Sequence, residues 1–177
     1  MTTDTSLRSL TQQFTRTGRL EGIYVRTSRR GPVTSVSEAR VELGRGLIGD
    51  HRSEKQRSGD DARKRELTLI QAEHIELLAG WLGQGDIDPA RLRRNLVVSG
   101  INLIAMRSSF PDMTLEWRLG DEVRIVVTGP CAPCSRMEEE LGTGGYNAMR
   151  GHGGVTARLT VPGTVRVGDA VRLVARE

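Results

Sequence analysis

The chain has 177 residues, the length of one ordinary domain or of one domain with a short arm. Hydrophobic residues make up 37% of it and charged residues 27%, a mixture too apolar for a fully disordered protein. No run approaches the roughly 18 consecutive apolar residues of a membrane span, and the first twenty residues lack the apolar core of a secretory signal. We therefore expect a cytoplasmic protein with no membrane partner.

The charge pattern favours a small anionic ligand over nucleic acid. The formal net charge is only +4, and the 26 basic residues, nearly all Arg, lie among 22 acidic ones. Two Trp, two Tyr and two Phe provide few rings on which bases of a single strand would stack. Guanidinium groups do suit phosphate recognition. We expect a small-molecule substrate and no nucleic-acid partner.

Apolar and polar residues alternate over 20–26, which predicts a strand, and a weaker strand is predicted over 34–42 after the turn at Gly31-Pro32. Residues 44–65 are rich in glycine and charge and show no periodicity. A loop of that length inside a small domain is usually functional or disordered.

The main helix is predicted over 70–81, where apolar residues and His74 recur at helical spacing before Gly83 ends it. His74 lies on the apolar face of this helix, which favours a core or half-buried histidine. A shorter helix opens at Asp88-Pro89, with Asp as N-cap and Pro at the first helical position. It runs into a strand over 95–98.

The last third is predicted to be all β apart from one helical insertion. Strands are expected over 115–118 and 122–127, and the phrase at 118–124 returns in similar form at 166–172, which indicates a recurrent Gly-Asp turn. Many short strands favour a mainly β, α+β architecture, a barrel with peripheral helices, over a doubly wound sheet. We expect an N-terminal arm or short helix over 1–17 and the barrel domain over 18–177.

Both cysteines lie in one segment, where the strand predicted over 122–127 runs into a tight turn and Cys134 falls at the start of an expected helix. Helix N-terminal amides stabilise a thiolate, and Arg136 would act in the same direction. Four interpretations stand: two inert thiols, a zinc site, a thioredoxin-like Cys-Ala-Pro-Cys pair, or one cysteine that binds a metal or carries sulfur. A zinc site needs about four ligands, and only three histidines are available to join the cysteines.

Four segments together resemble the MOSC domain family, the fold shared with the C-terminal domain of molybdenum cofactor sulfurase. Their order and spacing, rather than any one motif, carry the resemblance, which covers roughly residues 18 to 175. The segments are Gly46-Leu47-Ile48-Gly49-Asp50-His51-Arg52, Arg65-Glu66-Leu67-Thr68-Leu69-Ile70, Arg93-Arg94-Asn95-Leu96-Val97-Val98-Ser99-Gly100-Ile101 and Pro133-Cys134-Ser135-Arg136-Met137.

The resemblance implies a MOSC-type β-barrel that binds a molybdenum cofactor (molybdopterin), with no zinc expected. By motif, the metal ligand and catalytic residue falls on Cys134. The cofactor-binding residues that the motifs imply are Asp50, His51, Arg52, Arg94, Asn95 and Arg136. Thiolate and guanidinium suit a soft metal and a phosphate, respectively. His152, in a glycine-rich loop, is a further candidate to line the site.

The function that the resemblance implies is an enzyme, a molybdenum-dependent oxidoreductase that reduces N-hydroxylated or N-oxide substrates. One alternative is a sulfur carrier or sulfurtransferase that works through a Cys134 persulfide. Another is a non-catalytic carrier of the cofactor. Cys131 stands where members of the family it resembles commonly carry a residue other than cysteine, often a basic one, and this second thiol keeps the sulfur-transfer alternative open. A redox or sulfur-donor protein is the expected partner, and the sequence does not set the oligomeric state.

Overall fold

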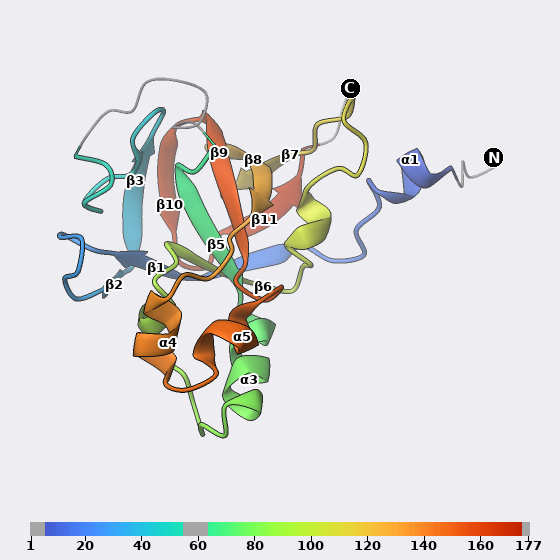
Figure 1. Ribbon diagram of the computed structural model, residues 1–177. Coiled ribbons are helices and arrows are strands. Elements are labelled where there is room, and N and C mark those ends of the chain that lie inside the picture. The colour runs from blue at the N-terminus through green and yellow to red at the C-terminus, as the bar shows by residue number, and fades with distance from the viewer. Residues whose placement is uncertain (1–5, 55–63, 175–177) are drawn as a thin grey trace.

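The computed structural model describes residues 6–54 and 64–174. Within these residues seven strands close into a mixed barrel (Figure 1), because β1 pairs with β6 on one side and with β11 on the other. The barrel order is β11-β7-β8-β9-β5-β6-β1. These strands are β1 (Gly18–Val25), β5 (Leu67–Gln71), β6 (Leu96–Ser99), β7 (Glu116–Leu119), β8 (Val123–Pro130), β9 (Val155–Val161) and β11 (Ala170–Leu173). The mainly β prediction is confirmed.

Smaller strands extend the barrel. β2 (Thr34–Val36) pairs with β1, whereas β10 (Gly163–Arg166), β3 (Glu38–Glu42) and β4 (Gly46–Leu47) form a separate sheet. The strand predicted over 34–42 is therefore divided at Ser37 between two sheets. Both predicted Gly-Asp turns are present, with φ of 61° at Gly120 and 97° at Gly168. The turn at Gly120 joins β7 to β8 within the barrel, whereas the turn at Gly168 leads from β10 of the small sheet to β11 of the barrel.

The parallel pair β5 and β6 is connected by α3 (Ala72–Trp81), which crosses over outside the barrel. The helix predicted over 70–81 is wrong at its first two residues, because Ile70 and Gln71 belong to β5. β5 is buried on both faces, so its apolar residues run on without alternation and merge with the helical pattern that follows. The predicted cap at Asp88 is confirmed, as its carboxylate accepts from the Ala90 amide at the start of η1 (Pro89–Leu92).

The helical layer covers one end of the barrel. α3, α4 (Arg136–Leu141) and α5 (Gly145–Met149) gather below the strands in Figure 1. The single predicted insertion in the last third is therefore two short helices. One apolar core fills the barrel around Trp117, and a second lies between these helices and the outer face of β5 and β6, where Ile70 and Val97 point.

Two short elements complete the description. α1 (Leu7–Leu10) precedes the barrel and is set apart from it in Figure 1, and η2 (Ile104–Met106) follows β6. The arm returns to the barrel at Phe14, whose ring meets that of Trp117 edge to face with centroids 4.7 Å apart. No helix in 6–54 or 64–174 is long and apolar enough to cross a membrane.

Candidate functional site

The two cysteines lie on one turn but in different surroundings. β8 ends at Pro130, after which Cys131 is buried and Cys134 is exposed, and both are free thiols. Sequence analysis put Cys134 at the helix start, whereas α4 begins two residues later, with Ser135 as its cap residue. The Cys134 carbonyl still accepts from the Met137 amide at 2.9 Å, which fixes the turn before the helix.

Arg94 is hydrogen-bonded to this turn. Its side chain is buried, with 8% of the residue exposed, and it donates to three backbone carbonyls. Nε donates to Gly153 O at 2.8 Å, Nη1 to Leu92 O at 2.9 Å and Nη2 to Cys131 O at 3.3 Å. Arg94 thus ties the cysteine turn to the loop before β9. A direct contact between Arg94 and a cofactor stays a prediction.

The glycines before β9 let the backbones approach this closely. A Cβ added at Gly153 would lie 2.4 Å from Cys131 O, and one at Gly154 would lie 1.9 Å from Leu69 O. Gly154 also has a φ of +84°, a conformation that other residues rarely adopt. The amide of Cys131 donates to Gly154 O at 2.8 Å, so the cysteine turn is anchored on both sides.

Asp50 is the centre of a second cluster. It is buried, and its carboxylate accepts from the backbone amides of Arg26 at 3.2 Å and Arg52 at 3.0 Å. The Arg26 Nε lies 3.7 Å away and the His51 Nδ1 lies 3.1 Å away. The His51 contact has the distance of an ion pair without the angles of a hydrogen bond. Asp50 therefore orders its loop against the end of β1.

Asn95 connects this cluster to the barrel. Its Nδ2 lies 3.5 Å from Asp50 Oδ2, and its Oδ1 accepts from the Thr68 hydroxyl at 3.0 Å. The structure thus brings Asp50, His51, Arg52 and Asn95 together in one cluster. They contact one another, backbone amides, the Thr68 hydroxyl and the Arg26 side chain. Their role toward a cofactor stays a prediction.

Four arginines gather beside the cysteine turn in a groove of about 240 Å³, here called the arginine groove, lined by Arg30, Arg91, Arg93, Arg136 and Glu140 together with Gly31, Pro32, Val33 and Ala90. Glu140 accepts from Arg136 Nε at 2.9 Å and lies 3.6 Å from Arg93 Nη1. Glu139, which does not line the groove, also pairs with Arg136 at 2.6 Å. Two carboxylates thus partner four guanidinium groups, which leaves the groove with an excess of positive charge.

Arg93 carries two marks of a constrained site. Among the described residues it is the one non-glycine residue with positive φ, at 59°. Burial lowers the pKa of Arg93, and the nearby charge of Arg26 lowers it further, while Glu140 raises it. A Cys134 thiolate also raises the pKa of Arg93, and it does the same for Arg94, so both cations lie within electrostatic reach of this sulfur. An anion bound in the groove would relieve this repulsion.

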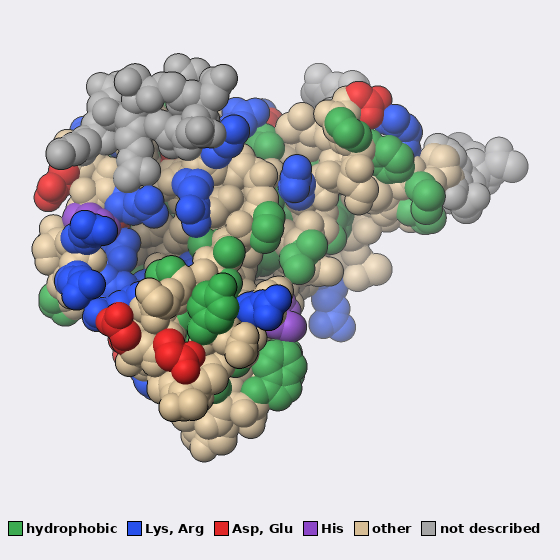
Figure 2. All heavy atoms as spheres, in the orientation of Figure 1, with side chains coloured by type: hydrophobic (Ala, Val, Ile, Leu, Met, Phe, Trp, Pro, Cys, Tyr) green, Lys and Arg blue, Asp and Glu red, His purple; other side chains and the backbone are tan. Residues whose placement is uncertain are grey.

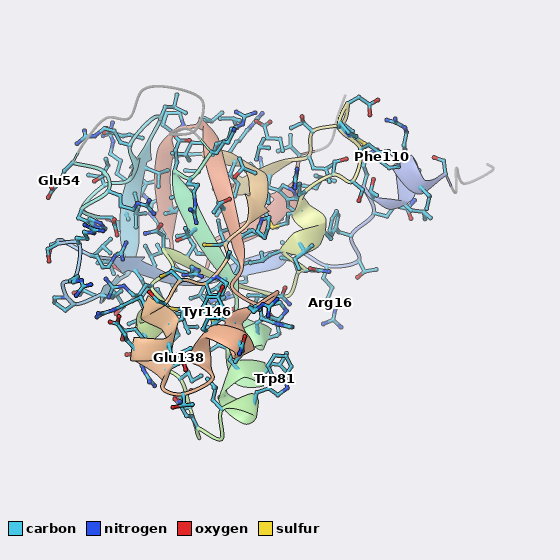
Figure 3. All side chains as sticks on the ribbon, in the orientation of Figure 1. Arg16, Glu54, Trp81, Phe110, Glu138 and Tyr146 are labelled. Carbon is cyan, nitrogen blue, oxygen red and sulfur yellow. The ribbon has the colours of Figure 1, made fainter. Side chains whose placement is uncertain are left out.

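The histidines do not join the cysteines. His74 and His152 stack edge to face with ring centroids 4.9 Å apart, and Trp81 meets His152 at the same distance. Figure 3 shows Trp81 projecting outward from α3. No group of three or more His, Cys, Asp or Glu side chains suited to a metal ion occurs in the described ranges.

Sequence reasoning missed the contributions of Arg26, Arg65 and Arg93. Arg65 Nη2 lies 3.8 Å from Cys131 Sγ, and Arg26 supports Asp50 from the end of β1. Arg65 and Arg93 stood inside the motifs already singled out, so the signal for them was present. Arg26 lies in no motif, and only the pairing of β1 with β6 brings it to the site.

Comparison with known proteins identifies the family and supports the fold. The family model described as MOSC domain matches residues 53–172. The fold is similar to the YuaD protein from Bacillus subtilis, with 18% identity and a TM-score of 0.73 over 92% of this chain and 98% of that one. It is also similar to YiiM from Escherichia coli, with 21% identity and a TM-score of 0.62 over 90% and 71%. No curated protein sequence matches the chain.

A second YiiM, from Geobacillus stearothermophilus, gives 16% identity and a TM-score of 0.64 over 90% of this chain and 76% of that one. At such identities the structural likeness speaks for the fold alone. The family match rests on the sequence and spans most of the chain, including both cysteines.

Proposed function

Because this chain belongs to the MOSC domain family, we propose that it binds a molybdenum cofactor through Cys134 and reduces N-hydroxylated or N-oxide substrates. The observation that carries the proposal is an exposed thiol beside an arginine groove. A soft thiolate suits molybdenum, and guanidinium groups suit the phosphate of the pterin. The residues present therefore fit the two ends of the cofactor.

Each residue has a distinct part in this scheme. Cys134 Sγ would hold the metal, and Arg93 and Arg136 would hold the phosphate. Arg94 positions the cysteine turn through its bond to the Cys131 carbonyl, and Asp50 keeps the adjoining loop in place. When bound, the cofactor supplies redox chemistry at molybdenum. Electrons would come from a redox partner protein.

The test is metal content after expression in a host that makes the cofactor. We expect molybdenum and pterin near one per chain, and loss of most of the metal in Cys134→Ser. Cys131→Ser is the matched control, since it removes the buried thiol of the same turn and should keep the metal. Equal molybdenum content in both variants would show that Cys134 is not a ligand of the metal. Turnover of an N-hydroxylated substrate with a chemical reductant then separates an enzyme from a cofactor carrier.

Sulfur transfer is the second candidate, favoured by the second thiol three residues before Cys134 and by Arg65 at its sulfur. In that case the Cys134 thiolate accepts a sulfane sulfur atom from a donor persulfide, and the donor leaves as a thiol. Attack of the Cys131 thiol on Cys134 Sγ then releases hydrosulfide and forms a Cys131–Cys134 disulfide, which an external thiol reduces. Mass spectrometry after incubation with a sulfur donor would find one added sulfur atom on the Cys134 peptide. Its absence, with molybdenum bound, would favour the reductase.

A further inference from the structure

A pocket of about 480 Å³ borders the cysteine turn and shares no lining residue with the arginine groove. It is bounded by the end of β8, the cysteine turn, the start of β9, α5 and η2. Its lining residues are Ile104, Arg107, Val127, Gly129, Pro130, Cys131, Ala132, Pro133, Tyr146, Arg150, Gly151, Gly153, Gly154 and Val155. The volume is that of a typical small-molecule site. We call it the Cys131 pocket.

The wall of the Cys131 pocket is apolar. Apart from its two arginines, its polar side-chain groups are the Tyr146 hydroxyl and the Cys131 thiol. Ile104 and Tyr146 are 57% and 41% exposed, which places two large apolar side chains at its rim. Figure 3 shows Tyr146 where the helical layer meets the barrel. A sugar or a free nucleoside would leave most of its hydroxyl groups without a partner here, so an apolar body fits better.

The charges of the pocket are all of one sign. Arg107 and Arg150 line it, and no Asp or Glu does. Arg65, at the sulfur of Cys131, adds a third cation close by. In the part of the chain that the structure describes, neither Arg107 nor Arg150 donates a side-chain hydrogen bond or forms an ion pair. In Figure 2 hydrophobic and basic side chains lie side by side across the middle of this face, and the acidic ones nearest to them lie lower, over α4.

We propose that the Cys131 pocket binds an apolar organic anion, with its hydrocarbon or aromatic part against Val127, Ile104 and Tyr146 and its anionic group between Arg107 and Arg150. Burying an apolar body against these side chains removes apolar surface from water, and the free guanidinium groups select an anion over a neutral molecule of the same shape. That this ligand is the substrate rests on the proposed function, because the pocket shares the cysteine turn with the metal-binding thiol. The binding site itself does not need the cofactor.

The test is a fluorescence titration of the cofactor-free protein with anilinonaphthalene sulfonate, an apolar anion that brightens in apolar sites. Arg107→Gln and Arg150→Gln should each weaken its binding about fivefold, and the double variant more than about tenfold. Arg172→Gln is the matched control, since Arg172 is exposed on β11 and does not line the pocket. Equal affinity in the double variant and the control would overturn the proposal.

Two further arms separate shape from charge. Gly129→Leu should abolish binding, because a Cβ at Gly129 meets nothing within 4 Å and its side chain would fill the pocket. Circular dichroism checks that this variant folds. Naphthalene sulfonate should displace the probe at a lower concentration than neutral naphthalene methanol, and the double variant should lose that preference. Displacement at equal concentrations from the unaltered protein would contradict the anionic part of the proposal.

The same titration distinguishes this inference from the proposed function. Cys134 does not line the pocket, so Cys134→Ser should keep the affinity for the probe while it loses molybdenum. If the protein binds molybdenum normally but does not bind the probe, the proposed anion site is refuted and the proposed cofactor binding stands. If probe binding depends on Arg107 and Arg150 but the protein takes up no molybdenum, the anion site is supported and the proposed function is refuted.

Discussion

Replacing Arg94 with Ala should destabilise the protein strongly. The guanidinium makes three hydrogen bonds to carbonyls in a buried place, two of them at 2.8 and 2.9 Å and the third at 3.3 Å. A hydrogen bond with a charged donor contributes about 1.5–3 kcal/mol. Burial without a carboxylate partner has a cost of its own and lowers the pKa of Arg94, so the net loss is smaller than the sum. We expect the free energy of unfolding to fall by about 2–5 kcal/mol.

Urea unfolding of the cofactor-free protein measures this loss directly. Arg172→Ala, at an exposed position, should change the free energy of unfolding by less than about 0.5 kcal/mol. The loss of unfolding free energy in Arg94→Lys should lie between those of Arg94→Ala and Arg172→Ala, because an ammonium group reaches fewer of the three carbonyls. This variant can still be measured if Arg94→Ala does not fold. An Arg94→Ala protein as stable as Arg172→Ala would refute the assignment of Arg94 as the residue that holds the cysteine turn.

Three further results are expected. Iodoacetamide should modify exposed Cys134 before buried Cys131, as peptide mass spectrometry will show, and equal rates would contradict the burial described here. Gly154→Ala should be more destabilising in urea than Gly151→Ala, because both have positive φ but only Gly154 has a backbone atom within 2 Å of the added Cβ. Burial, with the charge of His152, lowers the pKa of His74 below its ordinary 6.5, while Glu73 opposes this. The unfolded chain therefore takes up the proton first, and the free energy of unfolding should fall as pH drops through about 6.5, less steeply in His74→Gln.

The strands, the turns and the main helix followed from local patterns, because alternation, glycine and capping residues act over a few neighbours. The start of α3 did not follow, since Ile70 is apolar for the barrel wall and also matches the helical spacing after it. The barrel closes where β11 pairs with β1, two strands that are far apart in the sequence. No local pattern encodes such a pairing, and the resemblance to a family supplied it.

The candidate site was predictable as a set of residue types but not as an arrangement. The motifs implied that Arg94 and Arg136 bind a cofactor. Arg94 is buried against carbonyls, and Arg136 lines the arginine groove while it pairs with carboxylates of its own helix, so a contact of either with a cofactor stays a prediction. The partners of a side chain depend on which strands pair in the fold. The sequence around that side chain does not specify this pairing. The Cys131 pocket was missed for the same reason, as its walls come from three separate stretches of the chain, 104–107, 127–133 and 146–155.

The most direct test of the central claim is X-ray absorption at molybdenum in the loaded protein. If Cys134 Sγ binds the metal, the spectrum of Cys134→Ser, in whatever fraction still carries molybdenum, should show one sulfur neighbour fewer than the unaltered protein and Cys131→Ser. An identical sulfur shell in all three proteins would contradict the account.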